Sequence, residues 1–137
     1  MVSELVLAKR LHKLREYVRL LNILRSEPKE RFISEPFVYG NAERYLQLAI
    51  QTALDIGNHI LADRKFKEPD EYRDVIRMLG EHGVIEKDLA ARLLPLVGLR
   101  NILVHEYMDI DRGRLYESIQ NELEDFELFA RQVGKLL

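Results

Sequence analysis

The feature that most constrains the fold of this chain is an apolar segment from Leu93 to Val104. Among its twelve residues only Arg100 and Asn101 are polar, so a helix formed here is apolar on nearly every side. Such a helix is stable only where other elements bury it. The segment therefore predicts a core helix around which the other elements pack.

Arg100 lies in the middle of the leucine-rich stripe of this predicted helix. At about 100° per residue, Leu89, Leu93 and Leu96 fall within roughly 40° of it. A buried guanidinium costs several kcal/mol unless it pairs with an anion or opens onto solvent. Two explanations fit the pattern. Either Arg100 pairs with a buried carboxylate while His105 hydrogen-bonds the backbone, which fixes helix packing, or Arg100 binds an anion that comes from outside.

Chemically versatile side chains gather at the carboxyl end of the segment. His105 lies roughly 140° around the helix from Arg100, and Tyr107 returns to the face of the arginine. Gly98, two turns before His105, has no side chain and so allows close approach. A cation, a group that titrates near neutral pH and a phenol are therefore expected close to one helix end.

Arg100, His105 and Tyr107, within GLRNILVHEY, form a pattern that resembles the signature of the HepT-like branch of the HEPN domains. The segment DIGNHI, from Asp55 to Ile60, is also similar to that branch. Arg and His at this spacing are expected about 0.4 times by chance in such a chain, but adding the tyrosine lowers the expectation to about 0.02. The pair Arg77 and His82 has the same spacing but lacks the tyrosine.

The resemblance implies an all-α antiparallel up-and-down bundle of four to five helices. It also implies a homodimeric ribonuclease that needs neither metal nor cofactor and cuts RNA, with tRNA as the expected substrate. His105 is then the general base or acid, and Arg100 holds the scissile phosphate. Asn101 is expected to orient substrate or motif, with Asp55 and Asn58 as supporting residues.

The same resemblance implies a toxin-antitoxin pair. The antitoxin in such pairs is an MntA-like nucleotidyltransferase that transfers AMP to the tyrosine of the motif, here Tyr107. An adenylyl group there would block the substrate site by charge and by volume. The alternative function is a noncatalytic helical partner, or substrate-binding subunit, of a nucleotidyltransferase.

Composition is consistent with one domain over residues 1–137, because 47% hydrophobic and 32% charged residues are typical of a globular chain. No apolar run approaches the roughly 20 residues that a bilayer requires, and the expected location is the cytoplasm. The absence of cysteine excludes disulfides and thiol chemistry. The net charge of -2 argues against indiscriminate binding of nucleic acid. Residues 1–31 are nevertheless basic, with eight Lys or Arg against four Asp or Glu.

Apolar spacing of three and four residues recurs along the chain, whereas alternation typical of strands is absent. It predicts helices from Ser3 to Arg25, from Phe37 or Asn41 to Ala62, from Asp70 to Glu81, from Glu86 onward, and from Arg114 to Leu136. The stretch from Glu27 to Pro36 contains two prolines and is expected to be a loop or a fraying helix end. Glu106, Asp109 and Asp111 are the one acidic cluster that could hold a metal, but a solvated turn is favoured there.

Overall fold

The structure is a computed structural model that describes residues 4–105, 108 and 110–137. All regular structure in these residues is helical. The helices are α1 (Glu4–Arg25), α2 (Lys29–Ser34), α3 (Pro36–Asp63), α4 (Tyr72–Glu81), α5 (Lys87–His105) and α6 (Arg112–Gly134). None of the described helices is long and apolar enough to cross a membrane.

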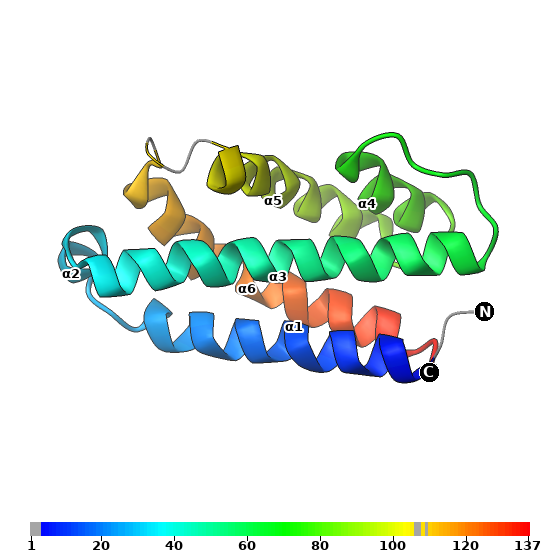
Figure 1. Cartoon of the computed structure of the whole chain (residues 1–137), viewed down its shortest axis with the longest axis horizontal. Helices are drawn as coiled ribbons and strands as arrows, with labels where there is room; N and C mark the ends of the chain where they lie inside the picture. The colour runs from blue at the N-terminus through cyan, green and yellow to red at the C-terminus, as the bar shows by residue number, and fades with distance from the viewer. Residues whose placement is uncertain (1–3, 106–107, 109) are drawn as a thin grey trace.

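The four long helices form an antiparallel bundle (Figure 1). Helices α1 and α5 run in one direction and α3 and α6 in the other, and α3 packs against both α1 and α5. The short α2 lies at the turn between α1 and α3, and α4 packs against α3 and α5 near the opposite end. This arrangement confirms the predicted all-α up-and-down bundle.

The predicted loop from Glu27 to Pro36 is wrong, because it contains helix α2. The two prolines bracket the helix: Pro28 precedes its first turn, and Pro36 is the first residue of α3. At these positions the missing N–H of proline costs no helical hydrogen bond. Phe32 holds α2 in place, since its ring is fully buried and meets the Tyr116 ring edge-on, with centroids 5.3 Å apart.

The predicted core helix is confirmed on one side of α5 only. Its buried residues are Leu89, Ala90, Leu93, Leu96, Val97, Leu99 and Leu103. The opposite side of α5 is open to solvent at Ala91, Leu94, Pro95, Gly98 and Asn101. We call these five residues the outer face of α5. Helix α5 therefore carries apolar residues that the described part of the chain does not bury.

Gly57 allows α3 and α4 to pack closely. A Cβ at this position would lie 2.6 Å from Val75 Cγ1 and 3.0 Å from Leu79 Cδ1, both on α4. Only glycine fits such a contact without displacing α4. The start of α4 lies beside the carboxyl-terminal half of α5, where Arg100 contacts Tyr72.

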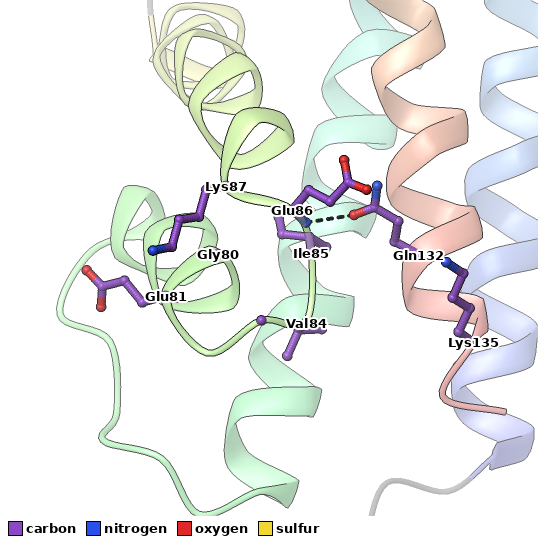
Figure 2. A pocket seen from close by; sticks show the side chains of 9 residues that line it. Gly80, Glu81, Val84, Ile85, Glu86, Lys87, Gln132 and Lys135 are labelled. Atoms are coloured by element: carbon purple, nitrogen blue, oxygen red, sulfur yellow. Dashed lines mark hydrogen bonds between the residues drawn. The ribbon is translucent and has the colours of Figure 1, made fainter.

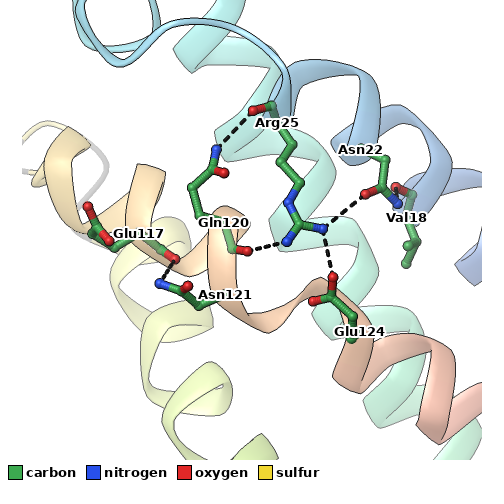
Figure 3. A network of polar contacts seen from close by, with 7 residues as sticks. All are labelled: Val18, Asn22, Arg25, Glu117, Gln120, Asn121 and Glu124. Atoms are coloured by element: carbon green, nitrogen blue, oxygen red, sulfur yellow. Dashed lines mark hydrogen bonds and ion pairs between the residues drawn. The ribbon is translucent and has the colours of Figure 1, made fainter.

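Polar contacts fix the helix ends. At the end of α1, Arg25 donates to Glu124 Oε1 at 2.8 Å and to the carbonyl of Gln120, while Gln120 Nε2 donates back to the Arg25 carbonyl at 2.9 Å (Figure 3). At the start of α5, the N–H of Glu86 donates to Gln132 Oε1 at 2.8 Å (Figure 2). The bonds to the Arg25 carbonyl and from the Glu86 N–H satisfy backbone groups that helix ends leave without intrahelical partners.

Candidate functional site

Arg100 is a half-buried residue of α5, and its side chain contacts both α3 and α4. Its Nε donates a hydrogen bond of 2.9 Å to Gln51 Oε1, and its Nη1 donates one of 3.2 Å to Asn101 Oδ1. The guanidinium carbon lies 4.5 Å from the centroid of the Tyr72 ring. All three contacts orient the guanidinium, but none neutralises its charge.

Asp55 supports this arrangement through Gln51. The Nε2 of Gln51 donates to Asp55 Oδ1 at 3.0 Å, which fixes the amide so that its oxygen faces Arg100. Arg10 of α1 reaches the Asp55 carbonyl at 3.5 Å. The structure therefore brings Arg100, Asn101 and Asp55 into one polar chain, with Gln51 as the link.

The explanation in which Arg100 pairs with an internal carboxylate is not met in the described part of the chain. No carboxylate of the residues in 4–105, 108 and 110–137 lies within ion-pair distance of its guanidinium. Asn58 is half-buried on α3, and no hydrogen bond among those residues joins it to Gln51, Asp55 or Arg100.

His105 is the last residue of α5, and its side chain is exposed. It is thus accessible to a ligand, as an acid or base must be. Its sequence neighbour in the motif, Tyr107, lies outside the described residues, as do Glu106 and Asp109 of the acidic cluster. The third member of that cluster, Asp111, caps α6 by accepting a hydrogen bond of 3.1 Å from the Arg114 N–H. Across the described residues no three metal-ligating side chains cluster.

A pocket of about 450 Å³ opens beside Arg100, between the start of α4 and the outer face of α5. Two of the residues that line it, Tyr72 and Asn101, also contact the guanidinium. The full lining is Glu71, Tyr72, Arg73, Leu94, Val97, Gly98 and Asn101. We call this the α4–α5 pocket.

Other pockets lie elsewhere. One of about 430 Å³, between the α4–α5 turn and the end of α6, has Glu81 and Lys87 on one side and Gln132 and Lys135 on the other (Figure 2), and no motif residue lines it. A smaller one, of about 250 Å³, lies between α3 and the carboxyl end of α5. Burial raises the pKa of Glu43 in its wall, and the charge of Arg112 opposes this rise.

Sequence reasoning missed Gln51 and Tyr72. Gln51 precedes Asp55 by one helical turn. The DIGNHI segment therefore indicated the correct region of α3, but the residue that contacts Arg100 directly is Gln51 and not Asp55. Tyr72 begins α4 and carries no motif. Both residues meet Arg100 only through packing of α3, α4 and α5, because 49 and 28 residues separate them from it along the chain.

Arg100 and His105 thus lie five residues apart on one helix, α5, of an all-helical bundle. The HepT-like ribonuclease family matches residues 9–133 of this chain. The chain belongs to that family.

Two relatives are nucleases by name. The tRNA nuclease HepT of Aphanizomenon flos-aquae is 38% identical over 95 residues, which are 69% of this chain and 65% of that protein. The mRNA nuclease HepT of Shewanella oneidensis is 36% identical over 84 residues, 61% of this chain and 63% of that protein. The chain thus matches slightly less than two thirds of the length of either relative.

Solved structures share the fold. One is a tri-AMPylated HEPN toxin of Shewanella oneidensis in complex with an MNT antitoxin, with a TM-score of 0.87 and 24% identity over 95% of this chain and 97% of that one. Another is YutE of Bacillus subtilis, described as a cytosolic protein of unknown function. Its TM-score is 0.88 at 24% identity, over 99% of this chain and 91% of that one.

Proposed function

We propose that this protein is a metal-independent endoribonuclease, the toxin of a toxin-antitoxin pair, with tRNA as its expected substrate. One observation carries the proposal: the Arg100 guanidinium is held by two amide oxygens and an aromatic ring, so its charge stays available for a phosphate. A structural arginine would be expected to meet a carboxylate instead. The nuclease relatives add support from family membership.

The proposed reaction uses the ribose beside the scissile bond. The 2′-hydroxyl attacks the phosphorus, the bond to the 5′-oxygen breaks, and a 2′,3′-cyclic phosphate forms. One imidazole accepts the proton of the 2′-hydroxyl and a second gives a proton to the leaving oxygen, so protons balance. Arg100 binds the phosphate oxygens and stabilises the negative charge that develops on them. Asn101 orients Arg100 directly, and Asp55 does so through Gln51. Asn58 is proposed as a further supporting residue.

A homodimer would supply both imidazoles. The part of the outer face of α5 at Ala91 and Pro95 is a suitable contact surface, because both residues are exposed on the same side of the helix as His105 and neither lines the α4–α5 pocket. Two copies joined along this face would bring their histidines toward a shared cleft. YutE is described as cytosolic, which supports a cytoplasmic location for this protein as well.

The first prediction concerns the motif. Arg100→Ala and His105→Ala are each expected to lower RNA cleavage at least about 100-fold, because each removes charge stabilisation or proton transfer in the transition state. The measurement is cleavage of purified tRNA, with the new ends mapped, alongside size-exclusion chromatography to verify that the dimer persists.

Arg77→Ala is the matched control, since Arg77 has a histidine five residues later but ion-pairs with Asp74 and Glu81 on the surface of α4. It should cleave as the wild type does. Equal activity of the wild type and both motif variants would reject the nuclease. A protein that binds a nucleotidyltransferase but cuts no RNA would instead fit the noncatalytic partner.

The second prediction concerns the antitoxin. We propose that an MntA-like nucleotidyltransferase transfers AMP to the Tyr107 hydroxyl, releasing pyrophosphate from ATP. The tri-AMPylated relative supports this modification. Co-expression with the transferase should add whole adenylyl units to the intact mass and stop cleavage, whereas Tyr107→Phe should stay unmodified. A protein neutralised without any mass change would contradict the proposal.

A further inference from the structure

The α4–α5 pocket has a lining that suits a planar ligand with apolar faces and polar edges. Leu94, Val97 and Gly98 give apolar surface from α5, and the Tyr72 ring gives an aromatic one. Glu71, Arg73 and Asn101 supply charged and amide groups. A pocket of about 450 Å³ with a few polar groups on an apolar lining has the size and character of a small-molecule site.

The polar groups in this lining are available to a ligand. Asn101 Oδ1 accepts from Arg100, which leaves the NH2 group of Asn101 to donate, since none of the described residues accepts from it. Arg73 forms no hydrogen bond or ion pair with any described residue, unlike its neighbour Arg77. Glu71 adds a carboxylate acceptor. The pocket thus offers both donors and an acceptor to the edge of a ligand.

The pocket adjoins the Arg100 guanidinium, the proposed phosphate-binding group, because two of its lining residues contact that guanidinium. Tyr72 lies under the Arg100 guanidinium on one ring face, yet 37% of the residue remains exposed. Asn101 joins the two sites from the other side, because it both lines the pocket and binds Arg100. A phosphate on Arg100 would therefore carry its attached nucleoside to the mouth of this pocket.

We propose that the α4–α5 pocket binds an unstacked nucleobase of the RNA, next to the phosphate that Arg100 holds. Proteins read single-stranded RNA by stacking splayed bases on aromatic or guanidinium planes and by hydrogen-bonding their edges. Tyr72 and Arg73 are then specificity-determining residues, because contacts to phosphate position an RNA while contacts to bases select its sequence. The inference rests on the proposed ribonuclease function and extends it to base selection.

The first test is binding, which does not depend on cleavage. The full-length His105→Ala protein is titrated with the four nucleoside 5′-monophosphates and with ribose 5-phosphate, and backbone amide shifts are followed by NMR. Nucleotides should shift the amides of Leu94 and Gly98, which line the pocket and form no contact with the guanidinium, whereas ribose 5-phosphate, which lacks the base, should leave both unshifted. Arg73→Ala should weaken nucleotide binding about tenfold, and Arg77→Ala should leave it unchanged.

The second test separates base binding from the support that Tyr72 gives to Arg100. Tyr72→Leu and Arg73→Ala are assayed on a cleaved RNA and on the same RNA made abasic at each nucleotide flanking the cut. At one position the abasic change should lower kcat/KM for the wild type about tenfold but barely affect either variant. A loss caused by misplaced Arg100 would instead be the same on both RNAs.

The two tests also distinguish failure of the base-binding pocket from failure of the proposed ribonuclease function. Nucleotide-specific shifts without any RNA cleavage would reject the ribonuclease and keep the pocket. Cleavage with equal binding of ribose 5-phosphate and nucleotides, or variant losses that do not depend on the flanking base, would overturn the pocket and keep the ribonuclease.

Discussion

At the scale of residues, the important fact about Arg100 is the kind of partner it has. A carboxylate would hold the guanidinium more strongly but would also cancel the charge that a phosphate needs. Gln51 and Asn101 offer amide oxygens, and Tyr72 offers a ring face. These partners orient the guanidinium but leave its positive charge in place. A half-buried arginine needs both properties to bind an anion.

The charge of the side chain at position 51 should therefore decide whether Arg100 is free to bind a phosphate. Gln51→Glu should lower RNA cleavage at least about tenfold, because the new carboxylate competes with substrate phosphate for Arg100. Gln51→Leu should lower it less, about threefold to fivefold, since Arg100 loses one orienting acceptor of about 1 kcal/mol but keeps its charge. Initial rates on one RNA give the comparison.

Both substitutions also remove the hydrogen bond from Gln51 to Asp55, so the loss of that contact is common to the pair. The Glu variant keeps an acceptor for Arg100 and adds a negative charge, whereas the Leu variant has neither, so slower cleavage by the Glu variant reports the effect of the charge. Cleavage by Gln51→Glu at or above the rate of Gln51→Leu would show that Arg100 does not act as the phosphate ligand.

At the scale of elements, the site depends on how closely α4 approaches α3. Gly57 sets that distance, because its missing side chain makes room for Val75 and Leu79. Tyr72 stands at the beginning of the same helix α4, so any displacement of α4 moves the aromatic ring that lies against Arg100. Helix packing and the site are thus coupled through one element.

Gly57→Ala is expected to lower the free energy of unfolding by about 1–3 kcal/mol, as for overpacking of a well-filled core. Gly40→Ala in the same helix is the matched control. A Cβ at Gly40 meets nothing within 4 Å, so there the better helix propensity of alanine should raise stability by about 0.5–1 kcal/mol. Urea denaturation followed by circular dichroism measures both. Equal effects of the two substitutions would contradict the packing role of Gly57.

At the scale of the whole molecule, the outer face of α5 is the feature that the monomer does not explain. One side of α5 supplies the core, while the other leaves Ala91, Leu94 and Pro95 in solvent. We propose that a second copy binds the part of this face at Ala91 and Pro95, which lies outside the α4–α5 pocket, and that it completes the candidate active site beside the exposed His105.

Ala91→Glu should therefore convert the dimer to a monomer and lower cleavage at least about tenfold, because two charges would be buried in the interface. Light scattering coupled to size-exclusion chromatography gives the mass. Leu5→Glu on α1, where the leucine is 64% exposed, is the control and should change neither mass nor rate. A monomeric wild type would reject the homodimer, and a dimeric Ala91→Glu protein with full activity would place the interface elsewhere.

The sequence by itself determined the elements that rest on local patterns. Spacing of apolar residues located the five longer helices, and the motif at Arg100 and His105 indicated the candidate site, because both patterns are contained within a few turns of chain. Helix α2 was not predicted, because it is held by burial of the single ring of Phe32 against α6 and has no repeating apolar pattern.

Only the tertiary structure decided what Arg100 touches. Gln51, Tyr72 and the α4–α5 pocket come from three helices that are distant along the chain, and their meeting depends on close packing at Gly57. Local patterns record which residues turn inward, whereas the partner that each one meets is fixed by how the helices cross. The physical reason is that helix formation is governed by neighbours in sequence, and a binding site by neighbours in space.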